Sequence, residues 1–136
     1  MARAMDLTPL LAPRSVAVVG ASERPDSYGG NVLANLRRAG YRGSVHGVNP
    51  GRDSAHGYPC LPSLADLPEP ADAVVVAIPA AGVNAVIAEA AELGCGGAVV
   101  LSAGFAESEG GRALQGELRE TALAARLPVC GPNGNG

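Results

Sequence analysis

Short apolar runs alternate along the chain with longer segments in which apolar residues recur every three or four positions. Short, mostly apolar runs bounded by glycine, proline or polar residues are typical of strands buried in a parallel sheet. The pattern predicts strands at Val16–Val19, Val45–Val48, Ala73–Ile78, Ala98–Leu101 and Leu127–Cys130. The Ala73–Ile78 run is apolar throughout, which favours a central position in the sheet.

The segments between these runs have the spacing of amphipathic helices. Val32, Leu33 and Leu36 share one face of a helix predicted over Asn31–Ala39, and Gly40 is a suitable stop. Other helices are predicted at Leu7–Leu11, around Val83–Ala90 with an end at Gly94, over about Gly110–Ala125, and as one turn begun by Ser63 after a short strand or turn at Tyr58. Alternating strands and helices predict an α/β fold, with an open, mostly parallel sheet and helices on both faces.

The turn after the first strand is rich in small residues. Gly20, Ala21 and Ser22 follow the strand directly, and a helix begins near Gly29-Gly30. Such a turn brings backbone N–H groups and a helix N-terminus to one point, which favours a phosphate group. The dinucleotide-binding pattern requires glycines where Ser22 and Pro25 stand, so a plain strand–helix connection is the alternative interpretation.

The turn after the second strand contains Asn49-Pro50-Gly51-Arg52, where folds that bind NAD place a carboxylate for the ribose hydroxyls. A guanidinium at this point suits a phosphate monoester, because it donates paired hydrogen bonds. The two turns together predict a nucleotide with an additional phosphate, and coenzyme A is the leading candidate. A solvated surface arginine is the alternative for Arg52.

Two later turns reach the same edge of the predicted sheet, where open sheets of this kind bind ligands. Pro79 fixes the backbone beyond the third strand and is expected to form one wall of a nucleotide slot, or else simply to start a helix. Ser102, Ala103 and Gly104 offer small side chains and N–H groups for a pantetheine or adenine edge, or else form an ordinary β–α turn.

Composition narrows the classes of function. The 136 residues have a net charge of −3, all ten basic residues are arginine, and aromatic residues make up only 3%. Nucleic-acid binding is not expected, since stacking platforms need aromatic side chains. The longest uncharged apolar stretch, around Ala73–Ala88, is interrupted by Pro79, Gly82 and Asn84 and is not expected to span a membrane.

The reactive residue types do not form a recognisable catalytic or metal-binding set. Cys60, Cys95 and Cys130 lack metal-ligand spacing and are not preceded by a signal peptide, which favours a reduced, cytoplasmic protein. Cys130 is expected to be buried and inert. His46 falls within a predicted strand and His56 in a loop, and neither has a suitable catalytic partner. The chain is therefore interpreted as a binding module without catalytic residues or a metal.

From Leu10 to Asn133, the chain resembles the N-terminal CoA-binding domain of NDP-forming acyl-CoA synthetases, relatives of the succinyl-CoA synthetase alpha subunit. The motifs that carry the resemblance occur in the expected order: Gly20-Ala21-Ser22, Gly40-Tyr41-Arg42-Gly43, Val48-Asn49-Pro50, Pro62-Ser63-Leu64, Ala77-Ile78-Pro79-Ala80, Ser102-Ala103-Gly104-Phe105 and Gly131-Pro132-Asn133. Each motif is short, and their shared order and spacing make the match specific.

The resemblance implies a Rossmann-like domain that holds CoA or an acyl-CoA. The positions that match CoA-contacting loops of the family are Gly20, Ala21, Ser22, Arg52, Pro79, Ala80, Ser102, Ala103 and Gly104. Two departures limit the comparison. An insertion at Glu23–Tyr28 follows the first loop, and Gly134 replaces the cysteine or serine that usually follows the asparagine of the last motif.

In that family, phosphate passes from a nucleoside triphosphate through a phosphohistidine to an acyl phosphate, which CoA then attacks. The resemblance places the phosphohistidine and the nucleotide-grasp element in other domains, and neither His46 nor His56 matches the former. The chain is therefore expected to be a domain cut from a longer ADP-forming acyl-CoA (acetyl-CoA) ligase. Its expected partners are CoA, the downstream ligase domains and, through an exposed sheet face, a neighbouring subunit.

Two other functions stay open at this point. The first is an NADP-dependent oxidoreductase domain, because an arginine after the second strand suits a 2′-phosphate as well. The second is a stand-alone, non-catalytic CoA-binding or regulatory module, because similar domains also occur as short separate proteins and because a fold alone does not establish a function.

Overall fold

The computed structural model describes residues 6–24, 26–101 and 109–131 of the chain. The elements follow in the order α1 (Thr8–Leu11), β1 (Ser15–Val19), α2 (Tyr28–Arg38), β2 (Ser44–Val48), β3 (Ser54–Ala55), β4 (Tyr58–Leu61), the 3₁₀ helix η1 (Leu64–Asp66), β5 (Ala73–Val76), α3 (Ala80–Leu93), β6 (Gly97–Val100), α4 (Glu109–Ala125) and β7 (Val129–Cys130). The order of strands and helices is the one expected from the apolar pattern.

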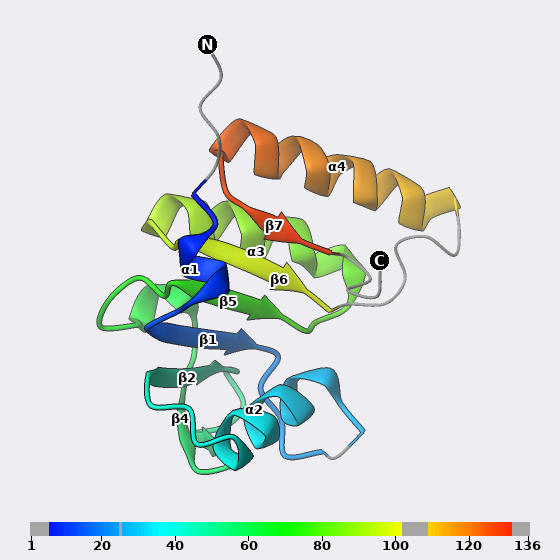
Figure 1. Cartoon of the computed structure of the whole chain (residues 1–136). Helices are drawn as coiled ribbons and strands as arrows, with labels where there is room; N and C mark the ends of the chain where they lie inside the picture. The colour runs from blue at the N-terminus through cyan, green and yellow to red at the C-terminus, as the bar shows by residue number, and fades with distance from the viewer. Residues whose placement is uncertain (1–5, 25, 102–108, 132–136) are drawn as a thin grey trace.

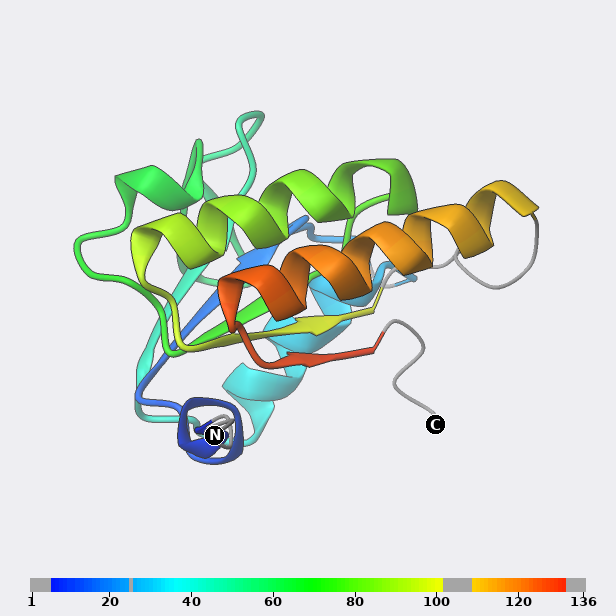
Figure 2. The same cartoon turned by 90° about the horizontal axis from the view of Figure 1, so that it is seen from above.

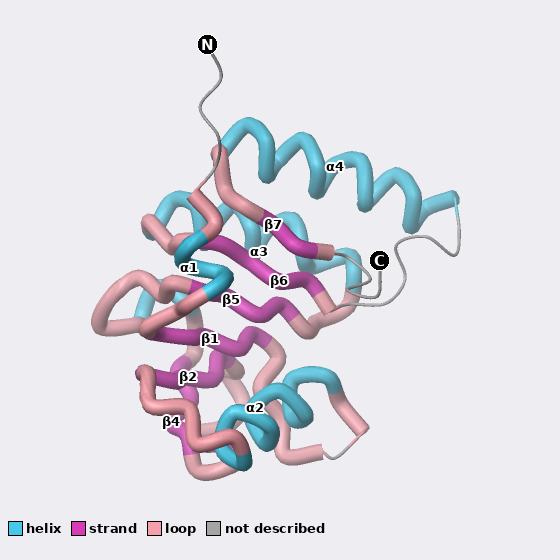
Figure 3. Tube along the Cα trace, in the orientation of Figure 1, coloured by secondary structure: helices cyan, strands magenta, loops and turns pink. Residues whose placement is uncertain are grey.

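The strands form one sheet in the order β3-β4-β2-β1-β5-β6-β7. Figures 1 and 3 label the strands from β4 to β7. All neighbouring pairs are parallel except β3 and β4, which form a short antiparallel pair. The register places Val19 of β1 opposite Val48 of β2 and Val76 of β5, so these three strands end at one level. The predicted Rossmann-like, mostly parallel sheet is confirmed.

Helices cover both faces of the sheet (Figure 2). On one face, α3 and α4 pack over a core that includes Val74, Val76 and Val100 of the strands and Ile87 of α3, all essentially buried. On the other face, α2 buries Leu33 against Val18. Alternate residues of β1 and β5 therefore enter opposite cores, which explains why these strands are apolar at every position.

Several local details differ from the sequence-based expectation: α2 begins at Tyr28 rather than Asn31, and β5 ends at Val76 rather than Ile78. Strand β3 was not predicted, because Ser54–Ala55 is too short to show any periodicity. Strand β7 begins at Val129 rather than Leu127, because the backbone N–H of Leu127 donates to the carbonyl of Ala122 and so still closes the end of α4. The predicted end of α3 at Gly94 is confirmed, with φ of 85° at that residue.

Helix α2 approaches the end of β1 more closely than any side chain would permit. A Cβ atom added at Gly29 would collide with the backbone carbonyl of Gly20, and one added at Gly30 would collide with the loop before the helix, including Ser27. In contrast, a Cβ atom at Gly116, within α4, would have nothing within 4 Å. Glycine at positions 29 and 30 therefore sets how closely the helix N-terminus meets the first strand.

We predict that alanine at Gly29 and alanine at Gly116 have opposite effects on stability. Gly29→Ala should lower the free energy of unfolding by roughly 1–3 kcal/mol, because the added methyl group overpacks a backbone contact. The matched control Gly116→Ala should raise it by about 0.5–1 kcal/mol, because an exposed helical glycine loses backbone entropy on folding. Urea titration followed by circular dichroism measures both, and equal effects of the two changes would contradict this account.

Candidate ligand site at the carboxyl edge of the sheet

The carboxyl ends of β1, β2 and β5 meet at one edge of the sheet. The N–H of Gly20 donates to the carbonyl of Val48 at 3.1 Å, and the N–H of Ala77 donates to the carbonyl of Val19 at 2.8 Å. From β1 the chain builds the sheet first through β2 to one side and later through β5 to the other. Open α/β sheets bind their ligands outside the strand ends at such a switch point.

The loop after β1 is a tight turn with a glycine in the left-handed region. Gly20 has φ of 95°, and a Cβ atom at this position would collide with the carbonyl of Ala77. Ala21 is buried, while the Ser22 Oγ accepts a hydrogen bond from the N–H of Arg24 at 3.0 Å. The Ser22 hydroxyl keeps its own proton for another acceptor. Ser27 caps α2 by accepting from the N–H of Gly30 at 3.0 Å.

Asn49 connects this loop to the turn after β2. Its Nδ2 donates to the carbonyl of Ala21 at 2.9 Å, and its Oδ1 accepts from the N–H of Gly51 at 2.7 Å. The backbone N–H of Asn49 donates to the carbonyl of Leu61 at the end of β4, at 2.9 Å. One residue thus contacts the segments that follow β1, β2 and β4.

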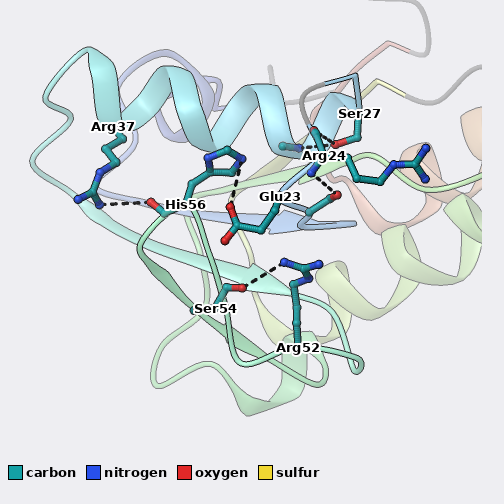
Figure 4. A network of polar contacts seen from close by, with 9 residues as sticks. Glu23, Arg24, Ser27, Arg37, Arg52, Ser54 and His56 are labelled. Carbon is teal, nitrogen blue, oxygen red and sulfur yellow. Dashed lines mark hydrogen bonds and ion pairs between the residues drawn. The ribbon is translucent and has the colours of Figure 1, made fainter.

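Arg52 lies at the end of the same turn and is half-buried. Its Nη1 donates a long hydrogen bond, 3.4 Å, to the carbonyl of Ser54. Figure 4 shows the guanidinium pointing from the turn after β2 toward the loop that carries Glu23. Arg52 and Glu23 both influence the pKa of the Cys60 thiol, so the two side chains lie near the same point. The structure therefore brings Arg52 to the edge occupied by the Gly20–Ser22 loop.

Pro79 and Ala80 stand at the start of α3, beyond β5. Pro79 is exposed and occupies the N-cap position, without a side-chain cap, and Ala80 is buried. The N-terminus of α3 therefore also opens at the carboxyl edge, where its dipole favours negative charge. The proposed roles of Ser102, Ala103 and Gly104 concern residues outside the described part of the chain.

A pocket of about 360 Å³ lies beside these loops, between the strand ends and α3. Among the nine residues predicted to bind a ligand, Gly20 lines it. The other lining residues are Val19, Val48, Asn49, Pro50, Pro62, Ser63, Leu64, Ile78, Val86 and Glu89. The walls are mainly apolar, which suits the flat face of a purine, and the Asn49 amide and the Gly20 backbone stand among them.

In the sequence there was only weak evidence that the other pocket-lining residues belong to a binding site. Val48-Asn49-Pro50 and Pro62-Ser63-Leu64 were motifs of the family resemblance, but a turn asparagine and a helix-starting serine also have ordinary structural roles. Nothing in the sequence indicated that Val86 and Glu89 line the pocket, because their position depends on how α3 packs beside the strand ends. A larger pocket of about 470 Å³ lies elsewhere, between α4 and β7, and it is lined by none of the six predicted residues that lie in the described part of the chain.

His56 and Glu23 form a contact between the first loop and the β3–β4 turn (Figure 4). The His56 Nε2 lies 3.8 Å from the Glu23 Oε1 and has no hydrogen-bond partner among the described residues. His56 has φ of 50°, and its backbone carbonyl accepts from Arg37 of α2 at 3.2 Å. These contacts support the loop from outside. The sequence indicated no carboxylate partner for His56, but the structure places Glu23 beside it.

Two further observations concern membranes and metal ions. Within residues 6–24, 26–101 and 109–131, no helix combines the length and apolar character needed to cross a bilayer. Over the same residues, histidine, cysteine and carboxylate side chains do not gather in groups of three or more that could hold a metal ion.

The chain belongs to the CoA-binding domain family, because the family profile, described as "CoA binding domain", matches residues 14–136. A curated relative, "Acetate--CoA ligase [ADP-forming] II" of Archaeoglobus fulgidus, is 39% identical over 96% of this chain. Among solved structures, the apo form of the dinucleotide forming acetyl-coenzyme A synthetase 1 of Ca. Korarchaeum cryptofilum is 38% identical over 94% of the chain, with a TM-score of 0.86. The chain is thus homologous to the N-terminal part of ADP-forming acyl-CoA synthetases.

These two proteins are much longer than the chain, which spans 20% of the first and 28% of the second. A third match is to a protein of similar length to this chain. "Conserved hypothetical protein Pfu-723267-001" from Pyrococcus furiosus is 32% identical, has a TM-score of 0.69, and the alignment covers 85% of this chain and 90% of that one.

The cysteines correct one expectation. Cys130 was expected to be buried, but it is exposed, because β7 is the edge strand of the sheet. Cys60 and Cys95 are buried, and burial raises the pKa of both thiols. Arg52 partly opposes this rise at Cys60. A raised pKa means less thiolate at neutral pH and hence slower reaction with disulfide reagents.

We predict that one thiol reacts rapidly with a chromogenic disulfide at pH 7.5 and that two more react only after unfolding. The rapid reaction should be that of Cys130. Cys130→Ser should therefore remove it and leave unchanged the later reaction of the two buried thiols, which follows unfolding. Absorbance of the released thiolate measures both phases. A rapid phase that persists in Cys130→Ser would contradict the assignment of the buried thiols.

Proposed function

We propose that the domain binds coenzyme A through its 3′-phosphorylated ADP end at the carboxyl edge of the sheet. The observation that carries the proposal is the juxtaposition of two phosphate-binding features beside one pocket. The Gly20–Ser22 loop with the N-terminus of α2 suits the pyrophosphate, and Arg52 suits the 3′-phosphate. Membership of the CoA-binding domain family supports the same ligand.

The adenine ring is proposed to occupy the pocket of about 360 Å³ between the strand ends and α3. Val48, Ile78 and Val86 supply apolar walls, and the volume falls in the range of roughly 300–1,000 Å³ that is usual for small-molecule sites. The pantetheine arm would then extend along the sheet edge past Pro79 and Ala80.

We further propose that the domain serves an acid–thiol ligase of the ADP-forming acyl-CoA synthetase type. The named activity of the A. fulgidus relative and the high structural similarity to the Korarchaeum enzyme support this class. Within it, the domain would hold CoA while the phosphohistidine and the bound nucleotide are supplied by other domains. No residue of this chain is proposed to be catalytic. The three free cysteines suit a reducing, cytoplasmic location.

A second candidate is a separate CoA-binding module without ligase activity. The observation that favours it is the P. furiosus protein, of whose chain the alignment covers 90%. Both candidates bind CoA at the same edge. They differ in whether this domain, mixed with the remaining ligase domains, supports ADP-dependent formation of acyl-CoA.

We predict that the 136-residue chain binds CoA more tightly than dephospho-CoA, because only CoA offers a phosphate to Arg52. A charge-assisted contact contributes about 1.5–3 kcal/mol, so Arg52→Ala should weaken CoA binding roughly ten- to a hundredfold. It should leave the affinity for dephospho-CoA nearly unchanged. Isothermal titration calorimetry measures all four affinities.

Arg38→Ala is the matched control, because Arg38 is an exposed arginine at the end of α2, at the opposite end of that helix from the loop. This variant should bind CoA like the wild type. Equal wild-type affinities for CoA and dephospho-CoA would refute the role of Arg52. Saturable binding of NADPH without binding of CoA would instead favour an oxidoreductase domain.

A further inference from the structure

We propose that Asn49 is a positioning residue that fixes the Arg52 turn relative to the Gly20–Ser22 loop, so that the 3′-phosphate and the pyrophosphate are bound together. The inference rests on the proposed binding of CoA. It assigns to Asn49 the discrimination between CoA and dephospho-CoA, although the group that would touch the 3′-phosphate is Arg52.

The geometry uses both ends of the Asn49 amide. Nδ2 donates to the carbonyl of Ala21, in the middle of the first loop, and Oδ1 accepts from the N–H of Gly51, the residue before Arg52. Distances of 2.9 and 2.7 Å show that both hydrogen bonds are well formed. The side chain is half-buried, so water competes less for these bonds than at an exposed site.

Other contacts hold each loop but do not replace this one. Ser22 bonds within its own loop to Arg24, and Arg52 bonds to Ser54 of the neighbouring strand. Among the described residues, the Asn49 amide makes the only side-chain hydrogen bond between residues 20–24 and residues 49–52. The pairing of β1 with β2 brings the two turns together, and beyond it this one side chain sets the spacing of the two proposed phosphate contacts.

The residue type agrees with this role. An asparagine whose Oδ1 caps a turn is common, and aspartate or serine can cap the same turn through an oxygen acceptor. The donor to Ala21 needs the amide nitrogen, which aspartate lacks. A carboxylate here would also face the Ala21 carbonyl and stand beside an incoming phosphate. The turn alone therefore permits three residue types, whereas the link to the first loop requires asparagine.

The test measures the ratio of the affinities for CoA and dephospho-CoA by calorimetry in wild type, Asn49→Ser, Asn49→Asp and Arg52→Ala. The serine variant keeps a neutral turn acceptor but is too short to bridge both loops. We expect its ratio to fall at least threefold toward one, while its affinity for dephospho-CoA falls less. Asn49→Asp should lower the ratio further. In Arg52→Ala the ratio should be near one, and adding Asn49→Ser should not change it.

Asn35→Ser, at an exposed asparagine of α2, is the matched control and should keep the wild-type ratio. Thermal melting of each variant monitors folding separately. The affinities of Asn49→Ser for CoA and dephospho-CoA could instead fall by the same factor, so that the wild-type ratio is retained. This result would give Asn49 only a general structural role and would overturn the inference. A wild-type protein that binds neither ligand would refute the proposed function itself, and a wild-type ratio of one would remove Arg52 and this inference together.

Discussion

The close backbone contact between the end of β1 and the start of α2 is the constraint on which the site depends. Gly29 lies against the carbonyl of Gly20, and Gly20 in turn lies against the carbonyl of Ala77 beyond β5. The end of β1, the start of α2 and the distant residue Ala77 are therefore packed with no side chain between them. This contact brings the α2 N-terminus to the centre of the sheet edge, where its dipole favours negative charge.

The rest of the edge is arranged around that contact. The level ends of β1, β2 and β5 bring the Asn49 turn alongside the first loop, and α3 begins beside them at Pro79. The two cores on either side of the sheet are composed largely of small aliphatic residues such as Val18 and Val76. Their close packing holds the strand ends level, and so the binding loops need few side-chain contacts of their own.

The strands and helices of this fold could be predicted because burial on both faces leaves long apolar signals, as in Ala73–Ile78 and around Ile87. The short β3 left no such signal, since a two-residue pair depends on its neighbour rather than on its own sequence. The exposure of Cys130 was predicted wrongly, because an apolar run does not show which strand lies at the edge. The tight turns after β1 and β2 were predictable from glycine and proline, whereas Asn49 looked like an ordinary turn residue until its partner Ala21 was placed beside it.

The most direct test of the central claim is an NMR titration of the ¹⁵N-labelled chain with CoA. The account predicts saturable changes in the amide signals of Gly20–Ser22, Gly29, Gly51 and Arg52, with little change at Gly116 and Leu123 beside the larger pocket on α4. Changes confined to the α4–β7 pocket, with the signals of Gly20 and Gly51 unmoved at saturation, would contradict it.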